Sequence, residues 1–390
     1  MSARVGPILV GCAIVAVVLA ISTVWVAGAM GSSAARPASH PEVTVDWKTL
    51  PGETLVAAPP PGASQPDDIA WLPAGGLDHG RSLIWTEFQN RVNPNGTPST
   101  QYGPDQSVIA GFDPTTGLLV RAISVPGHVD GVTGDPSTDQ LLVTTNEDAN
   151  SAFYLIDPAT ASVKTYTYAP DPAVLGNGGT DSLVIINGVF YVSHSNPNDL
   201  TQPTAYAMTL INSAPTLTAE LAPVFYDDST ALDALTGQNI TMALTDPDTN
   251  YLMPSTSPLY AGDLATVSQA DGRLIFASHL GCDPKLVQLN LTDNVSGNLP
   301  PIDGIAVTTA NGGTLYASDP GADGGLGQIF AFSTTGYPAG TVFVTEPADN
   351  GNPLIGILNL TTGVITPFGN HLINPKGLIY VAPDGIESGV

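Results

Sequence analysis

Lysine and arginine are scarce in this sequence, which has 10 of them among 390 residues against 35 aspartates and glutamates. The formal net charge is −25, and only 12% of the residues are charged. Binding to nucleic acid requires a basic face, and so few cations cannot build one. An acidic surface instead favours cations, cationic ligands or solubility alone. We therefore expect a monomer whose partner is a small molecule or a protein and not a nucleic acid.

Cysteine is also scarce, with only Cys12 and Cys282. Cys12 lies in an uncharged run of 23 residues, 7–29, which ends in the small-x-small sequence Ala-Gly-Ala that is typical of a cleavage site. We predict that 1–29 is a signal peptide; because the run is long enough to span a bilayer, an uncleaved membrane anchor is the alternative. Both interpretations place the rest of the chain outside the cytoplasm, secreted or anchored by its N-terminal segment. Cleavage would leave Cys282 as the only thiol, so stability must come from packing and not from an intramolecular disulfide.

Residues 30–66 contain three consecutive prolines, 59–61, and show little periodicity. Such a composition predicts a linker, within which 44–56 could add one strand. The main domain is then predicted over 67–390.

Helical periodicity is almost absent from this main domain, and short β-branched and aromatic runs alternate with turn residues. Five segments share one form: an Asp, an apolar strand, a tight turn and a second strand that carries an aromatic residue. They run over 68–87, 130–146, 181–194, 263–279 and 303–319. Turn dipeptides such as Asn187-Gly188 and Asp271-Gly272 tolerate the positive φ angles of hairpin turns. We interpret each segment as a β-hairpin.

A second hairpin is predicted after each first one, for example SVIAGFDPTTGLLVRAI at 107–123 and LIGILNLTTGVITPF at 354–368. Two hairpins make a four-stranded antiparallel blade of a size that is typical of β-propellers. The predicted fold class is therefore an all-β propeller with six blades, or seven because 239–254 resembles another first hairpin. The isolated strand predicted within 374–381 would close the ring by pairing with an early strand.

The first residue of a hairpin lies beside its last residue, so the repeated polar positions should gather at one mouth of the central channel. This predicted rim pairs the five opening aspartates with the five closing residues, and Lys376 occupies the last opening. Its members are Asp68, Asp130, Asp181, Asp263, Asp303, Glu87, Asn146, His194, His279, Asp319 and Lys376.

Crowded carboxylates raise each other's pKa unless a cation or a hydrogen-bond donor compensates them. A divalent cation is one compensation: oxygen ligands suit calcium or magnesium, and histidine ligands favour zinc or manganese. The candidate metal ligands are Asp68, Asp130, Asp303, Asp319, His194 and His279; the candidate ligand-binding residues are Glu87, Asn146, Asp181, Asp263 and Lys376. Two alternatives stay open. The carboxylates could form ion pairs with Lys376 and the imidazoles, or each aspartate could only accept backbone N–H groups at its own strand entrance.

The segments IDGIAVTTANGGTLYASDP (302–320) and VDGVTGDPSTDQLLVTTN (129–146) resemble NHL-type repeats and are similar to the senescence-marker/gluconolactonase propellers. The resemblance covers about 68–382 and rests on short motifs. It implies a metal held by a Glu and by Asn or Asp residues at blade openings, which Asp130 and Asp303 match, with Asp68 in the place of the Glu. The Pro-Asn-Gly opening of that family is missing, and Lys376 stands where an acid is expected.

Motifs for nucleotide binding or for a serine nucleophile are missing: no GxGxxG follows a strand, and no Walker loop or GxSxG is present. We therefore predict a propeller that binds a small ligand or partner at an acidic channel mouth. The alternative is a metal-dependent hydrolase or lyase of the lactonase class, in which a metal-bound water is the nucleophile. The sequence leaves open whether the protein is an enzyme.

Overall fold

The computed structural model describes residues 53–72, 82–98, 105–172, 178–197, 200–213, 216–281, 283–348, 352–369 and 372–385. The predicted leader (1–29), the first part of the predicted linker (30–52) and Cys282 lie outside the described residues. Thr49–Val390 form a compact unit of their own. None of the described helices is long and apolar enough to cross a membrane.

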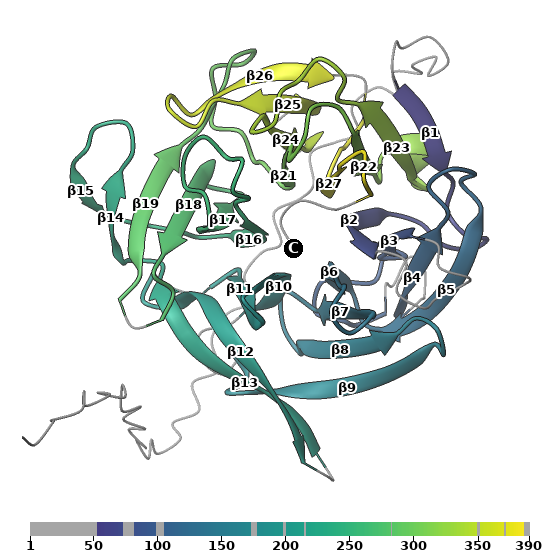
Figure 1. Ribbon diagram of the computed structural model, residues 1–390. Coiled ribbons are helices and arrows are strands. Elements are labelled where there is room, and N and C mark those ends of the chain that lie inside the picture. The colour runs from purple at the N-terminus through teal and green to yellow at the C-terminus, as the bar shows by residue number, and fades with distance from the viewer. Residues whose placement is uncertain are drawn as a thin grey trace, which may run out of the picture. The chain divides into compact units, whose positions relative to one another are not determined.

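The regular secondary structure of the described chain is almost entirely β-strand and forms a propeller-like ring of sheets (Figure 1). The first sheet has the order β2 (Pro66–Leu72), β3 (Leu83–Phe88), β4 (Gln106–Phe112) and β5 (Leu119–Pro126). The next eight strands are β6 (Val129–Asp135), β7 (Gln140–Thr145), β8 (Ala152–Asp157), β9 (Ser162–Ala169), β10 (Gly179–Ile186), β11 (Val189–Ser195), β12 (Pro203–Ser213) and β13 (Thr216–Tyr226). They belong to a single sheet, because the outer strands β9 and β13 pair in parallel.

The third sheet has six strands: β16 (Pro247–Leu252), β17 (Leu264–Ser268), β18 (Arg273–Ser278), β19 (Lys285–Asn290), β14 (Thr230–Asp233) and β15 (Asn239–Thr241). The fourth has five: β21 (Ile305–Val307), β24 (Val342–Glu346), β25 (Leu354–Leu358), β26 (Val364–Gly369) and β20 (Thr292–Asp293). The last has four: β27 (Leu378–Val381), β22 (Thr314–Asp319), β23 (Gln328–Ser333) and β1 (Glu53–Ala57). The short helix α2 (Ala322–Gly325) lies between β22 and β23.

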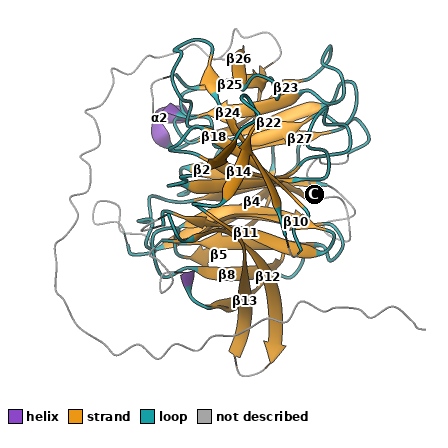
Figure 2. Ribbon diagram, turned by 90° about the vertical axis from the view of Figure 1, so that its left-hand side faces the viewer, coloured by secondary structure: helices purple, strands orange, loops and turns teal. Residues whose placement is uncertain are grey.

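The all-β class and the propeller-like ring were predicted correctly, but the predicted six or seven separate four-stranded blades are wrong. Only two of the five sheets have four strands. The eight-stranded sheet contains two antiparallel units, β6–β9 and β10–β13, merged along their outer edges by the pairing of Thr218 with Thr167. Strands β12 and β13 have 11 residues each, and their hairpin extends beyond the neighbouring strands (Figure 2). This extra length gives β13 an outer partner that a shorter strand would lack.

Three of the predicted first hairpins form, namely β2–β3, β6–β7 and β10–β11. Asn187 and Gly188 have φ angles of 53° and 77°, the conformation of a primed hairpin turn. The segment 263–279 also forms a hairpin, but its strands β17 and β18 are the second and third strands of their sheet and not the innermost pair. The hairpin predicted over 303–319 is wrong, because β21 and β22 lie in different sheets.

The two ends of the described chain meet in one sheet. Strand β27 pairs with β22, and β1 pairs with β23 on the outer side. The predicted direct pairing of the C-terminal strand with an early strand is therefore wrong, because two strands lie between them. Even so, both ends are held in the same sheet, which closes the ring.

Strands β2, β6, β10, β16, β21 and β27 lie nearest the axis, and each contacts the next around the ring (Figure 1). Apolar side chains fill the spaces between neighbouring sheets, as where Phe276 of β18 and Val344 of β24 belong to one buried cluster. Trp85 and Tyr154 share another such cluster. Burial of aromatic and aliphatic surface between sheets therefore holds the inner strands at fixed positions around the axis.

Candidate functional site

A cavity of about 650 Å³ lies at the end of the ring where the inner strands begin. We call it the central cavity. Among the described residues that line it, nine are acidic, two are basic, and only Ala270 is apolar. The lining residues are Asp67, Asp68, Gln89, His128, Asp130, Glu147, Asp148, Asp181, Asn196, Thr245, Asp246, Asp248, Gln269, Ala270, Asp303 and Lys376.

Irregular backbone at the start of the inner strands turns the acids toward this cavity. The strand register shifts between Pro66 and Ile69 in β2, Val129 and Gly131 in β6, Thr180 and Leu183 in β10, and Pro247 and Asn250 in β16. Each shifted stretch contains an aspartate that lines the cavity: Asp68, Asp130, Asp181 or Asp248. Bulges of this kind re-aim side chains that a regular strand would direct elsewhere. The aspartate that recurs at the start of these inner strands therefore lies in a β-bulge each time.

The inner strands also approach each other closely at this level. A Cβ on Gly131 would lie 2.5 Å from Oγ1 of Thr144 and 3.0 Å from the backbone oxygen of Asp181. The amide of Asn250 donates to the backbone oxygen of Ser182 at 3.1 Å, which ties β16 to β10. These contacts fix the relative positions of Asp130, Asp181 and Asp248.

Five of the predicted rim residues line the central cavity: Asp68, Asp130, Asp181, Asp303 and Lys376. Two more lie directly behind it. Glu87 is fully buried and accepts the backbone N–H of Asp68. The side chain of Asn146 accepts the backbone N–H of His128 at 2.9 Å.

The other predicted residues lie outside the cavity lining. His194 is buried, with Nδ1 3.0 Å from the backbone oxygen of Pro203. Asp319 is buried and accepts backbone N–H groups from Gly321, Ile373 and Asn374 at 2.7–2.9 Å. Such bonds correspond to the local role that was left open as an alternative.

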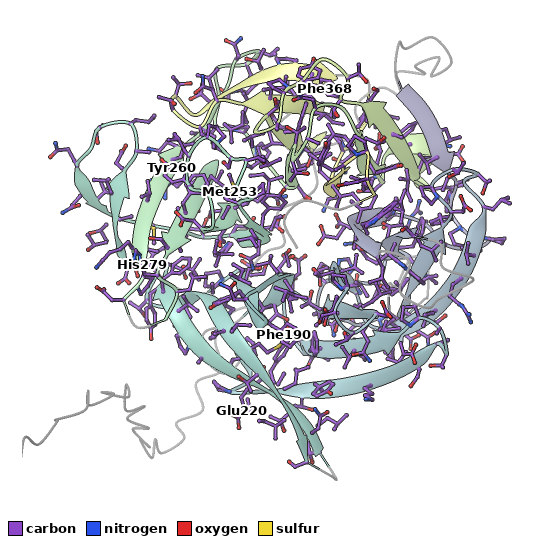
Figure 3. The ribbon with its side chains drawn as sticks, in the orientation of Figure 1. Phe190, Glu220, Met253, Tyr260, His279 and Phe368 are labelled. Carbon is purple, nitrogen blue, oxygen red and sulfur yellow. The ribbon has the colours of Figure 1, made fainter. Side chains whose placement is uncertain are left out.

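Asp263 and His279 do not reach the predicted rim. They flank the end of the β17–β18 hairpin at which Leu264 pairs with Ala277. The opposite end, at Ser268, is the one beside the cavity, because the next residue, Gln269, lines it. His279 is exposed and lies at the outside of the ring (Figure 3). The predicted position is wrong because β16, and not β17, is the inner strand of this sheet.

One group of potential metal ligands comes together in the described residues, namely His128, Asp130 and Glu147. One ligand atom from each lies within 4.8 Å of the others. Nε2 of His128 is 3.0 Å from Oδ1 of Asp130, while Nδ1 is 2.7 Å from the backbone oxygen of Val92. A histidine ligand typically donates its second ring N–H to such a carbonyl, which directs the other nitrogen to the metal. The group contains Asp130 but neither Asp68 nor Asp303.

Loops from three parts of the ring hold this group. The backbone N–H of Glu147 donates to Oδ2 of Asp130 at 3.1 Å, and the hydroxyl of Ser195 donates to Glu147 at 3.3 Å. Next to them, the backbone N–H of Asp148 donates to the backbone oxygen of Pro94 at 3.2 Å. The loop after β3 therefore positions both His128, through Val92, and the turn that carries Glu147.

Burial and mutual repulsion shift the pKa values of these groups. Burial, and then the charge of Asp130, raises the pKa of Glu147 to about 8. Burial lowers the pKa of His128, but the charge and hydrogen bond of Asp130 outweigh burial and raise it to about 9. Burial and then the charge of Asp248 raise the pKa of Asp181 well above its usual range. Excess negative charge is thus the dominant electrostatic property of the cavity.

Lys376 supplies the compensating charge on another wall of the cavity. Its ammonium lies 2.8 Å from Oδ2 of Asp67 and 3.5 Å from Oδ2 of Asp303. The amide of Gln89 donates to Asp67 at 2.6 Å, and that of Gln269 donates to Asp303 at 2.8 Å. This ion-pair alternative was one of the compensations considered from the sequence, and it occurs for these two aspartates.

Several cavity residues were missed from the sequence: His128, Glu147, Asp67, Asp148, Asp246 and Asp248. A signal existed for the first two, because His128 precedes Asp130 by two residues and Glu147 follows Asn146. Asp246 and Asp248 lie in the segment 239–254, which resembles the first hairpin of a seventh blade, and the sequence does not assign them to the rim.

No family model and no curated protein matches the chain. Among solved structures, the chain is similar to a streptogramin B lyase, with 12% identity over 87% of both chains and a TM-score of 0.42. It is also similar to the periplasmic gluconolactonase PpgL of Pseudomonas aeruginosa, with 12% identity over 81% of this chain and 88% of that one and a TM-score of 0.43. A third similar structure is the Cps50 (Swd1) β-propeller domain of Myceliophteria thermophila, with 11% identity, coverage of 81% and 99%, and a TM-score of 0.38. A gluconolactonase is thus among the similar structures, as the sequence resemblance led us to expect, while the propeller-like ring itself rests on the strand pairing of this chain.

Proposed function

We propose that this protein is a secreted or surface-tethered propeller-like monomer that binds a divalent cation and a small ligand or protein partner in its central cavity. The apolar run at 7–29 supports a place outside the cytoplasm. The observation that carries the proposal is the convergence of His128 Nε2 with carboxylates of Asp130 and Glu147, while Nδ1 is anchored on Val92. An imidazole held in this way is prepared as a ligand.

The donor set selects the class of metal. One imidazole and two carboxylates suit zinc or manganese better than calcium or magnesium, which prefer oxygen ligands alone. A cation there would also offset the burial of the Asp130 and Glu147 carboxylates and the repulsion between them. Its role in a binding protein would be to neutralise the wall and to orient a polar group of the ligand.

A metal-dependent hydrolase or lyase of lactone-like substrates is the second candidate. It is favoured by one further feature of the cavity: the ammonium of Lys376 and the carboxyl of Glu147 line the same space. A metal there would supply Lewis-acid chemistry, Lys376 could hold an oxyanion of the substrate, and Glu147, whose pKa is about 8, could exchange a proton near neutral pH. Turnover of a lactone panel that EDTA abolishes would favour this candidate over binding alone.

The test is metal titration by calorimetry on the full chain, after dialysis against EDTA. We expect one equivalent of zinc or manganese to bind the wild type, and binding to weaken roughly 10- to 100-fold in His128→Gln and Glu147→Gln. Asp263→Asn is the matched control, because Asp263 is an aspartate outside the cavity lining and should leave the affinity unchanged. Equal metal binding in the wild type and in His128→Gln would contradict the proposed site.

A further inference from the structure

The central cavity contains a buried carboxylate that the metal site does not use. Asp181 is only 5% exposed and lines the cavity, yet no described residue donates a hydrogen bond to its carboxylate or forms an ion pair with it. This differs from the buried Asp319, which accepts three backbone N–H groups. Asp181 therefore presents to the cavity a carboxylate that no described group of the chain compensates, and this carboxylate is available to a positively charged partner from outside the chain.

Asp248 extends this feature along the neighbouring inner strand. It lies in the bulge of β16, next to β10, and its carboxylate has one weak described donor, the hydroxyl of Thr249 at 3.4 Å. Asp246 lines the cavity on the same segment. Negative charge therefore continues from Asp181 across the wall formed by β10 and β16.

A single metal ion does not fit this wall. Within the described part of the chain, the only three ligand groups whose atoms come within 4.8 Å of one another are those of His128, Asp130 and Glu147. Asp181 and Asp248 do not belong to such a set, so an ion beside them would lack a third close ligand from a carboxylate, His or Cys. The charge is spread out, and an extended cation matches it better than a point charge does.

The size and lining of the cavity narrow the class of ligand further. About 650 Å³ is enough for a small organic molecule. Because Ala270 is the only apolar residue of the lining, little hydrophobic surface is offered, whereas amide groups of Gln89, Gln269 and Asn196 are within the same lining. A compact, strongly polar and positively charged molecule satisfies these conditions.

We propose that the central cavity binds an organic polyamine, a small molecule with at least two protonated amino groups, and that one ammonium lies between Asp181 and Asp248. The second ammonium lies farther along the acidic lining, toward Asp68 or Asp246. This proposal specifies the ligand of the proposed binding function and rests on the use of the same cavity. A linear polyamine and an amino sugar share this chemistry.

The experiment is isothermal calorimetry on the full chain in EDTA at low salt, so that no divalent cation contributes. Spermidine and 1,4-diaminobutane represent linear amines, and an oligomer of glucosamine represents amino sugars. Butylamine and 1,4-butanediol are the singly charged and neutral controls. We expect saturable binding of the linear amines, of the glucosamine oligomer or of both, with an affinity at least about tenfold higher than that for butylamine. This binding should be lost at high salt.

The variants Asp181→Asn and Asp248→Asn locate the site. Each should weaken amine binding by roughly 10- to 100-fold, because a charge-assisted hydrogen bond is lost, whereas Asp263→Asn should not change it. Neither Asp181 nor Asp248 belongs to the metal group, so both variants should still bind the divalent cation. Binding of that cation also shows that a variant is folded.

The outcomes separate this inference from the metal site. If the wild type binds zinc or manganese but none of the diamines better than butylamine, the polyamine inference is overturned and the metal site stands. If diamines bind but His128→Gln does not affect metal binding, the metal site fails alone. Equal amine affinity in the wild type, Asp181→Asn and Asp248→Asn would also overturn the inference, because the ligand would then bind elsewhere.

Discussion

Two walls of the central cavity both carry aspartates, but the aspartates differ in whether the chain provides them with a positively charged or hydrogen-bonding partner. On the wall formed by β2, β21 and β27, Lys376 lies between Asp67 and Asp303, and glutamine amides donate to both. On the wall formed by β10 and β16, Asp181 has no such partner among the described residues. On the first wall the chain itself provides partners for Asp67 and Asp303, although no described residue donates to the carboxylate of Asp68, whose pKa is raised by burial. On the second wall Asp181 depends on protons or on a bound cation. The only lysine among the described lining residues thus pairs with carboxylates on one wall of the cavity and leaves Asp181 on the other wall without a partner from the described residues.

Removal of Lys376 should have the largest effect on this comparison. Lys376→Met leaves Asp67 and Asp303 without their cation, and the lost buried ion pairs should lower the free energy of unfolding by about 3–5 kcal/mol. Urea denaturation at pH 7 measures the change. Asp67→Asn in the same background should recover part of the loss, because it removes one of the two stranded charges. Equal stability of the wild type and Lys376→Met would show that the first wall is not neutralised by this lysine.

The pH dependence of the free energy of unfolding should report on the excess negative charge of the second wall. Burial raises the pKa of Asp246 to about 6, so the folded protein keeps a proton that the unfolded chain releases near pH 3.8. The folded state binds more protons between these values, and stability therefore falls as pH rises through this window. Glu147, with its pKa of about 8, and His128, with its pKa of about 9, extend the fall to higher pH.

Urea denaturation in EDTA at pH 4.5, 6 and 8 should show this decline. Asp246→Asn should reduce this decline by about 2 kcal/mol, because most of the window between pH 3.8 and pH 6 lies above pH 4.5. A wild-type stability that rises from pH 4.5 to 8 would contradict the assignment of excess buried negative charge to the cavity.

A divalent cation should have a somewhat smaller effect on stability. At a concentration of zinc or manganese 100 times its dissociation constant, the folded state gains about 2.7 kcal/mol. The midpoint of thermal unfolding should rise accordingly in the wild type and much less in Glu147→Gln. A rise of equal size in both proteins would place the cation somewhere other than beside His128.

The repeated strands made much of this arrangement predictable. Asp68, Asp130 and Asp181 open segments that do form innermost hairpins, so their shared position at one mouth followed from antiparallel pairing. Asp303 and Lys376 also line the cavity, although the hairpin predicted after Asp303 does not form. A residue at the start of a strand therefore lines the cavity whenever that strand is an inner strand, even if no hairpin follows.

The remaining errors have a physical origin in long-range pairing. The turn Asp271-Gly272 indicates a hairpin but not whether that hairpin begins at the axis, so Asp263 and His279 were assigned to the wrong end. The parallel pairing of β9 with β13 depends on strand length and on neighbouring sheets, which local patterns do not encode. The spacing of His128 and Asp130 in the sequence does not give the orientation of the imidazole, because that orientation depends on the contact of Nδ1 with the loop that contains Val92.

The smallest effect is expected at the end of the ring away from the cavity, and it tests whether the comparison of walls is specific. Asp263 and His279 are the same residue types as the proposed ligands, but His279 is exposed and neither lines the cavity. Asp263→Asn and His279→Ala should therefore change the free energy of unfolding by less than about 0.5 kcal/mol. Calorimetry should find metal and diamine affinities that equal those of the wild type. A clear loss of either affinity would mean that negative charge anywhere on this acidic chain contributes, and the distinction between the two walls would then lose its basis.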